Sequence, residues 1–317
     1  MKSLFLSSLL ALGLLAVPAQ AAEYPAKPIT LMTAFNAGGG SDVSHRLLEK
    51  FAKGVFDQPI VVTYKAGAGG EIGWTWLVGA KADGYTIGGV DLPHIVLQPM
   101  LRPEGQPGYK TEQLSPLCGL VYDADVVMVP EDGPYKTFKD LIGYAKANPG
   151  KVKVATVGKL TGDHLFLMQI EKLTGAKFTQ VPYSGSGKAI PALLSGEVDA
   201  YFGSGSSFLR MEKTRGLAIG SKERYELCPD VPTFIEQGYA IESGKYRGLA
   251  TPQNIPAEAR QYLETKFAEL CATPEYQKAV KSSGLMPQFQ TGKAFGEIIR
   301  TEGEQAKKIL EAYGLLK

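Results

Sequence analysis

Apolar runs alternate with amphipathic runs along the first hundred residues of the chain. Residues 29–35 are mostly apolar, residues 36–42 are a glycine-rich polar stretch, and residues 43–51 carry apolar side chains at helical spacing. This pattern predicts a strand, a loop and a helix. Further strands are expected at 59–64 and 85–90, with a helix at 72–81. Alternating strands and helices predict an α/β fold with a mostly parallel sheet covered by helices on both faces.

A second unit of strand, glycine turn and helix follows near the middle of the chain, at residues 151–157, 158–164 and 165–174. Residues 102–119 contain several prolines and glycines, so we expect a loop there. The remaining strands are expected at 126–130, 178–183, 198–202, 217–220 and 246–251, and the remaining helices at 136–147, 188–195, 257–272, 274–283 and 292–313.

The two glycine turns are candidate anion sites. Three glycines at positions 38–40 remove side chains from the first turn, so backbone N–H groups can approach a ligand closely. Ser41 and Asp42 are favourable N-cap residues for the following helix. A helix N-terminus presents unpaired N–H groups and the positive end of the helix dipole. The turn at 158–164 repeats this arrangement, and the sequence therefore predicts two anion-binding loops.

Each of these positions also has an ordinary structural interpretation. Glycine turns between strands and helices are common simply because they allow the turn. Asp42 as a helix cap alone, Lys159 as a solvated surface residue and Trp74 as a core residue all remain open. A single helix histidine such as His45 is most often structural. One loop alone would be weak evidence for a ligand.

Composition and charge narrow the classes of function. The chain has 317 residues, of which 44% are hydrophobic and 21% charged, which is ordinary for a globular protein long enough for two domains. The net charge is only +2, from 34 basic and 32 acidic residues. Because nothing suggests a strongly basic surface, we expect no nucleic-acid partner.

The first 21 residues have the pattern of a cleaved signal peptide. Lys2 supplies a positive start, residues 4–17 are apolar, and Ala19-Gln20-Ala21 is a small-x-small cleavage site. No cysteine adjoins that site, so we expect no lipid anchor. The prediction is export with cleavage after Ala21, and a mature protein in the periplasm.

Cysteine spacing and catalytic motifs point to no cofactor and no metal. Cys118, Cys228 and Cys271 fit no metal motif, and in an oxidising compartment we favour a Cys228–Cys271 bridge. The glycine loops do not complete a dinucleotide fingerprint or a phosphate loop, and the chain has neither a nucleophile elbow nor a zinc-protease helix.

Several short motifs together resemble one family, the Bug receptors, which are the extracytoplasmic solute receptors of tripartite tricarboxylate transporters. In chain order they are Tyr24-Pro25-x-Lys27-Pro28-Ile29, Phe35-x-Ala37-Gly38-Gly39-x-Ser41-Asp42, Gly67-Ala68-Gly69-Gly70-x-Ile72-Gly73, Asp83-Gly84-Tyr85-Thr86, Ala147-Asn148-Pro149-Gly150-Lys151, His164-Leu165, Val181-Pro182-Tyr183-x-Gly185 and Pro229-Asp230-Val231-Pro232-Thr233. The resemblance covers nearly all of the mature chain.

The resemblance implies a two-domain periplasmic-binding-protein clamshell of the type II-like, Venus flytrap kind. Each domain would hold a mixed, mostly parallel sheet flanked by helices. Domain 1 would comprise residues 22–124 plus 243–317, and domain 2 residues 125–242. The family's large and small integral membrane subunits would be the partners of this receptor, which we expect to be a monomer.

In that family the two glycine loops grip one ligand carboxylate from opposite domains, largely through backbone N–H groups. The resemblance and the loops together suggest these ligand-binding residues: Phe35, Asn36, Ala37, Gly38, Gly39, Gly40, Ser41, Asp42, Gly158, Lys159, Thr161, Gly162, Asp163, His164, Tyr183 and Ser204. Asn36 replaces the usual proline and adds an amide to the pocket. Asp163 replaces a frequent serine, and would cap the helix, pair with Lys159 or recognise a cationic group. Asp91 to His94 and Tyr246-Arg247 are further candidates for specificity.

The leading hypothesis is a receptor that closes around a small organic carboxylate, whether a dicarboxylate, a tricarboxylate, an aromatic carboxylate or an amino acid. An exported hydrolase using Ser41 with His164 is the alternative, although no motif places a serine beside a base and an orienting acid. A structural or sensor-docking protein is a third class.

Overall fold

The computed structural model describes residues 23–159 and 161–316, so the signal peptide expected at 1–21 lies outside the described residues. The strands are β1 (Ile29–Thr33), β2 (Ile60–Tyr64), β3 (Thr86–Asp91), β4 (Leu114–Pro130), β5 (Lys153–Thr156), β6 (Thr179–Pro182), β7 (Ala200–Ser204), β8 (Thr214–Ile219), β9 (Gly244–Pro252) and β10 (Met286–Thr291). The helices are α1 (Gly40–Ala52), α2 (Glu71–Val78), α3 (His94–Leu101), α4 (Phe138–Ala147), α5 (Gly162–Thr174), α6 (Ser186–Leu194), α7 (Gly205–Phe208), α8 (Ala257–Ala272), α9 (Pro274–Ser282) and α10 (Gly292–Ala312), with short 3₁₀ turns at Ala68–Gly70 and Thr111–Gln113.

The α/β architecture is organised around one long strand, β4, which joins two parts of a mixed sheet. Residues 114–124 of β4 pair with β9, and its N-terminal part also pairs with β10, whereas residues 125–130 pair with β7 and β8. The path through the sheet is β2-β1-β3-β9-β4-β7-β5-β6. Parallel pairs link β1 with β2 and β3, and β5 with β6 and β7, while the pairs made by β4 and β9 are antiparallel.

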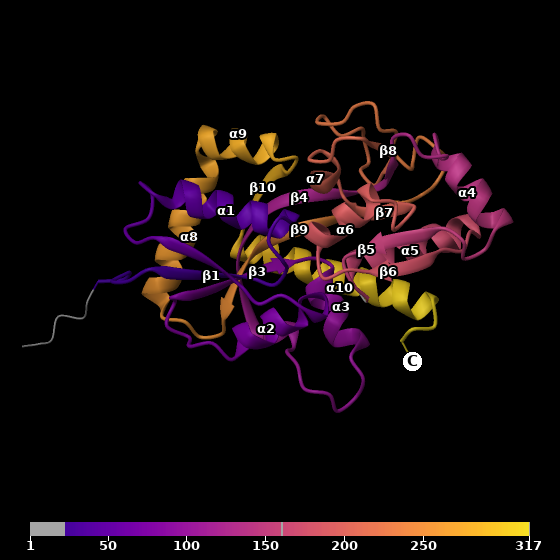
Figure 1. Cartoon of the computed structure of the whole chain (residues 1–317). Coiled ribbons are helices and arrows are strands. Elements are labelled where there is room, and N and C mark those ends of the chain that lie inside the picture. Colours follow the sequence, from indigo (N-terminus) through magenta and orange to yellow (C-terminus); the bar gives the residue numbers. More distant parts are fainter. Residues whose placement is uncertain (1–22, 160, 317) are drawn as a thin grey trace, which may run out of the picture.

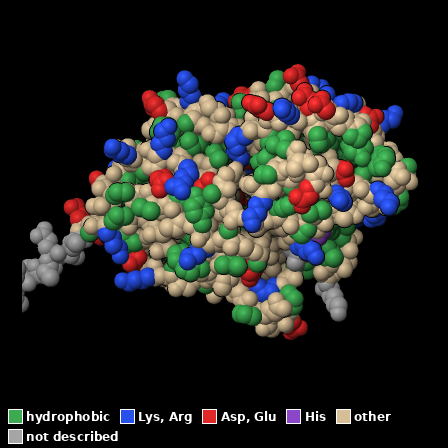
Figure 2. All heavy atoms as spheres, in the orientation of Figure 1, with side chains coloured by type: hydrophobic (Ala, Val, Ile, Leu, Met, Phe, Trp, Pro, Cys, Tyr) green, Lys and Arg blue, Asp and Glu red, His purple; other side chains and the backbone are tan. Residues whose placement is uncertain are grey.

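Two halves with separate cores lie on either side of the point where β4 changes partners (Figure 1). We call the part with β1–β3 the first half; its strands pack against α1, α8 and α9 on one side and against α2, α3 and α10 on the other. The second half contains β5–β8 and α4–α7, and its largest aromatic cluster joins Phe138, Phe166, Phe202 and Phe234. In the face that Figure 2 shows, acidic and basic side chains are interspersed, and no continuous basic surface appears there.

Several segments differ from the sequence prediction, among them the short helix α7, which was not expected. The loop expected over 102–119 is wrong from Leu114 onward, because those residues form the start of β4; the ladder tolerates Pro116 through a register shift between Pro116 and Cys118. Helix α3, which contains Pro99, and strand β10, whose residues are only half buried, were not expected. Neither has a clear helical or alternating apolar pattern, so tertiary pairing decides their structure.

The expected Cys228–Cys271 bridge is also wrong. All three cysteines are free and buried. Cys228 packs in a core cluster of the second half, whereas Cys271 packs in the first half beside Cys118. Burial raises the pKa of the Cys228 thiol to about 11 and that of Cys271 to about 12. These thiols therefore behave as small apolar core groups.

The buried His45 should make the folded state sensitive to acid. It is 1% exposed on α1, its Nδ1 lies 2.7 Å from Thr33 Oγ1, and burial lowers its pKa to about 3. The unfolded chain has an ordinary histidine pKa of about 6.5 and therefore takes up the proton first as pH falls. The stabilisation by neutral His45 is complete above pH 6.5 and is lost as pH falls toward 3, with about 2 kcal/mol lost by pH 5.

Urea unfolding of the mature chain at pH 7, 6 and 5 would measure this loss. His45→Gln should show a shallower decline in the free energy of unfolding than the unmodified chain. Equal slopes for the two proteins would contradict the assignment of acid sensitivity to His45.

Candidate functional site

The first glycine loop leads directly into α1, which begins at Gly40. Its N-cap is Gly39, in an extended conformation and without a side-chain cap, so the expectation that Ser41 or Asp42 caps this helix is wrong. Both lie in the first turn because the helix starts earlier than its apolar pattern indicates. The Asp42 carboxylate accepts a hydrogen bond from the Gly38 N–H at 2.7 Å, which closes the loop onto the helix. The first backbone N–H groups of α1 therefore have no side-chain cap, and the glycines around them leave room for a ligand to approach.

The second glycine loop leads into α5, whose N-cap is Thr161. Asp163 is fully buried and accepts a hydrogen bond from the Val157 N–H at 3.0 Å. Lys159 is exposed, and the ion-pair partner of Asp163 is Lys245. Asp163 thus neither caps α5 nor pairs with Lys159.

A small cavity, of about 30 Å³, lies between the two halves. The first residues of α1, α3, α5 and α6 converge on it, so four helix N-termini point their positive ends toward the same space. Its lining is formed by Phe35, Asn36, Gly39, Gly40, Ser41, Asp91, His94, Val157, Asp163, Gly185, Ser186, Tyr201, Ser204, Lys245 and Arg247. At this volume the cavity has room for one or two waters.

The cavity gathers some of the predicted ligand residues and not others. Those that line it are Phe35, Asn36, Gly39, Gly40, Ser41, Asp163 and Ser204. Those outside its lining are Ala37, Gly38, Asp42, Gly158, Lys159, Thr161, Gly162, His164 and Tyr183. Tyr183 instead donates a hydrogen bond to the Glu197 carboxylate at 2.7 Å. The ligand-binding role of both sets remains a prediction.

The two halves touch at the mouth of the cavity. Asn36 Nδ2 donates to Ser184 Oγ at 2.7 Å and to Ser184 O at 3.4 Å, and a Cβ added at Gly187 would lie 2.6 Å from Ala37 O. The segment facing residues 36–39 is therefore the 184–187 loop. The Gly158 turn lies instead against Gly69, where an added Cβ would be 3.6 Å from the Gly69 Cα.

The Asn36 bridge should contribute modestly to closure and hence to solute binding. Asn36→Ala removes its hydrogen bonds to Ser184, of which the shorter, at 2.7 Å, is worth about 0.5–1.5 kcal/mol, so we expect roughly 2- to 10-fold weaker binding by calorimetry. Asn148→Ala is the matched control, because the Asn148 amide bonds only Tyr144 of its own helix in the hydrogen bonds described. Equal affinity for the Asn36 and Asn148 variants would contradict this role.

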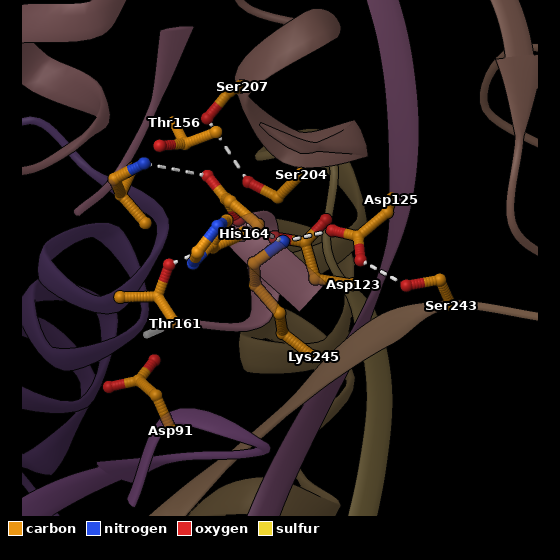
Figure 3. A network of polar contacts seen from close by, with 12 residues as sticks. Asp91, Asp123, Asp125, Thr156, Thr161, His164, Ser204, Ser207, Ser243 and Lys245 are labelled. Atoms are coloured by element: carbon orange, nitrogen blue, oxygen red, sulfur yellow. Dashed lines mark hydrogen bonds and ion pairs between the residues drawn. The ribbon is translucent and has the colours of Figure 1, made fainter. Parts of the chain in front are cut away.

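Lys245 on β9, which lines the cavity, is 3% exposed and lies between two carboxylates. Its ammonium contacts Asp125 of β4, and its Nζ is 2.9 Å from Asp163 Oδ1 of α5. Ser243 Oγ donates to the other Asp125 oxygen at 2.6 Å (Figure 3). Burial lowers the pKa of Lys245, but the two carboxylates outweigh it and raise the pKa above its usual range. Lys245 is therefore a permanently charged buried cation, and it links β9 and β4 to α5 of the second half.

Arg247, two residues along β9, makes a second group of the same kind. Its Nη1 lies 2.6 Å from Asp123 Oδ2 and its Nε 3.1 Å from Asp91 Oδ1. Asp123 also accepts from Ser206 N at 2.9 Å, and Asp91 accepts from Ser41 Oγ at 2.6 Å. Burial raises the pKa of Asp91, although the neighbouring Arg247 partly offsets this.

Sequence reasoning named Asp91, Asp163 and Arg247 of this charged network as candidates but missed the other half of it. Lys245, Asp123 and Asp125 were not anticipated, and neither were Gly185, Ser186 and Tyr201 of the lining. One signal was present: Asp123/Asp125 and Lys245/Arg247 are both spaced by two residues, which puts each pair on one face of a strand. Charged residues so spaced within apolar strands indicate a buried polar face.

Comparison with known proteins places this fold among the periplasmic binding proteins. The solved structure of the periplasmic binding protein BugD superposes with a TM-score of 0.87 at 26% identity, over 93% of this chain and 100% of that one. BugT of Bordetella pertussis is 35% identical over 87% of this chain and 86% of its own length. A protein of Cupriavidus necator is 30% identical over 97% of this chain and 94% of its own length. The model of the tripartite tricarboxylate transporter family receptor matches residues 45–315, and the chain belongs to this family of Bug receptors.

Proposed function

We propose that this receptor captures a small organic carboxylate in the cavity between its halves and delivers it to a tripartite transporter. The observation that carries the proposal is the convergence of the α1 and α6 N-termini on the cavity, one from each half. Their N–H groups, beside Gly39, Gly40, Gly185 and Ser186, would bind the carboxylate without a competing side-chain counterion.

Capture requires the cavity to open, since it has room for only one or two waters in the described state. We assign residues 22–124 plus 243–317 to one domain and residues 125–242 to the other. Strand pairing supports a hinge where the paired strands β4 and β9 pass from one half to the other. At that point, between Ala124 and Asp125, the partner of β4 changes from β9 to β7. Rotation there would separate the 36–39 loop from the 184–187 loop.

The cellular location and the membrane partners of this receptor are proposed from its role in solute capture. Within the described residues, no helix has the length and apolarity needed to span a bilayer. We propose a monomeric receptor, exported after cleavage at Ala21, which docks on the integral membrane subunits of the transporter.

Binding without turnover is favoured over hydrolysis. The Ser41 hydroxyl donates to the Asp91 carboxylate, and among the described hydrogen bonds it has no histidine partner. His164 lies outside the cavity lining. His94 lines the cavity, but its Nδ1 has no hydrogen-bond partner among the residues described. The Asp91 carboxylate that holds Ser41 is itself ion-paired with Arg247, and among the described hydrogen bonds Ser41 has no histidine base with an orienting acid.

A thermal-shift panel of small carboxylates tests this function. A receptor gains stability by mass action, about 2.7 kcal/mol when the ligand is at 100 times its dissociation constant. We expect at least one carboxylate to stabilise the mature chain and to be recovered chemically unchanged. Conversion of the ligand would refute the receptor assignment, and no stabilisation by any carboxylate would refute the ligand class.

A further inference from the structure

The cavity has more buried acid than buried base around it. Each cation is already paired with an aspartate outside the cavity lining: Lys245 with Asp125, and Arg247 with Asp123. These two aspartates are also satisfied by other donors, since Ser243 bonds Asp125 and Ser206 bonds Asp123. Each of these two pairs therefore carries no net charge.

Asp91 and Asp163 also contact these cations, Arg247 at 3.1 Å and Lys245 at 2.9 Å, so four buried carboxylates share two buried cations; Asp91 and Asp163 are the two that line the cavity. They come from opposite halves, Asp91 from the end of β3 and Asp163 from the first turn of α5, and they are 3% and 0% exposed. Asp163 Oδ1 contacts Lys245 Nζ at 2.9 Å and has no further polar partner among the described residues. Two buried carboxylates without a full share of positive charge are costly unless a cation joins them.

A neighbouring group provides an independent sign of an absent donor. His94 is 2% exposed, lines the cavity beside Phe35, and its Nδ1 has no hydrogen-bond partner in the part of the chain that the structure describes. Burial, together with the nearby Lys245 and Arg247, lowers the pKa of His94 well below its usual value, so the ring is neutral. A neutral imidazole can accept a hydrogen bond from an N–H group. Within the described residues, no cluster of three or more His, Cys, Asp or Glu side chains is suited to hold a metal ion, which favours an organic cation.

We propose that the solute is a zwitterionic amino acid, whose ammonium group binds between Asp91 and Asp163 while its carboxylate binds the N-termini of α1 and α6. This proposal rests on the proposed function and specifies its ligand class. It also gives Asp163 a role that fits its place in the lining, since a carboxylate there would repel a purely anionic solute. The charge-assisted hydrogen bonds to the ammonium make the amino group the main determinant of affinity.

Matched pairs of probes test the proposal. The dialysed mature chain is titrated by calorimetry with the common L-amino acids and, for each, the acid of the same carbon skeleton without the α-amino group. Such pairs are L-alanine with propionate, L-aspartate with succinate, and L-lysine with 6-aminohexanoate; putrescine serves as a cation without a carboxylate. We expect at least one amino acid to bind at least 10-fold more tightly than its partner acid, and putrescine to bind more weakly than that amino acid.

Substitutions of Asp91 and Asp163 test whether these residues cause the preference for amino acids over their partner acids. Asp163→Asn and Asp91→Asn should each reduce the ratio of amino-acid affinity to partner-acid affinity at least 10-fold, and either variant suffices if the other fails to fold. Asp230→Asn, at an exposed position, should keep the original ratio. Unchanged ratios in both cavity variants would overturn the proposal.

The outcomes separate this proposal from the proposed function. Binding of the partner acids as tightly as the amino acids would overturn the amino-acid proposal and leave a carboxylate receptor in place. Binding of putrescine more tightly than any amino acid would overturn the carboxylate end of the assignment. No binding by any member of the panel would overturn both.

Discussion

Replacing Lys245 with methionine should lower the free energy of unfolding by about 3–5 kcal/mol, the cost typical of breaking a buried ion pair from one side. Methionine fills most of the volume, but it leaves Asp125 and Asp163 facing each other without their shared cation. Both carboxylates are 1% exposed or less, so water cannot replace the ammonium. Urea unfolding at pH 7 would measure the change.

Two further variants sharpen that test. Lys159→Met removes an exposed lysine, and we expect a change within about 0.5 kcal/mol. Adding Asp163→Asn to Lys245→Met removes one of the stranded charges and should recover part of the lost stability. A cost for Lys245→Met no larger than that for Lys159→Met would show that Lys245 does not hold the network together.

Replacing Gly187 with valine should weaken solute binding roughly 5- to 150-fold while the chain stays folded. A Cβ there would lie 2.6 Å from Ala37 O, a backbone atom of the opposite half. This clash is relieved only if the two halves move apart at this point. Overpacking of this kind costs about 1–3 kcal/mol, which gives the stated range of affinity. In the proposed open state this contact would be absent, so the cost would fall on closure and therefore on binding.

Gly143→Val is the matched control for that variant. Gly143 is also a helical glycine, it is exposed on α4, and no atom lies within 4 Å of a Cβ built there. Both substitutions place a β-branched residue in a helix, so their effects on helix propensity are alike. Calorimetry with the tightest ligand from the carboxylate panel should show a loss for Gly187→Val alone. An equal loss in both variants would contradict the closure argument.

Local pattern was enough to predict the units that begin the two halves. The apolar run at 29–35 followed by a helix, and the repeat of that plan at 151–174, correspond to β1 with α1 and to β5 with α5. These elements have clear strand or helix periodicity, and their glycine turns mark the breaks between them. Helix starts were less well placed, because glycines at 39–40 and 162 are compatible with a helix's first turn as well as with a loop.

The charged network could not be predicted because its partners are distant in sequence. Lys245 meets Asp125 only because β9 returns beside β4 in an antiparallel register that pairs Lys245 with Asp123. No local feature of either segment fixes that register. The same holds for the 184–187 loop, which faces Asn36 only through the docking of one half on the other. Pairings of this kind depend on the assembled sheet rather than on propensity.

The position of a bound solute tests the central claim most directly. A crystal structure of the mature chain with its tightest ligand should show the ligand carboxylate at Gly39 to Ser41 and at Gly185 and Ser186, inside the cavity between the halves. Density instead in the separate hollow between α5 and α10, beside Gln169 and Glu302, would contradict the account.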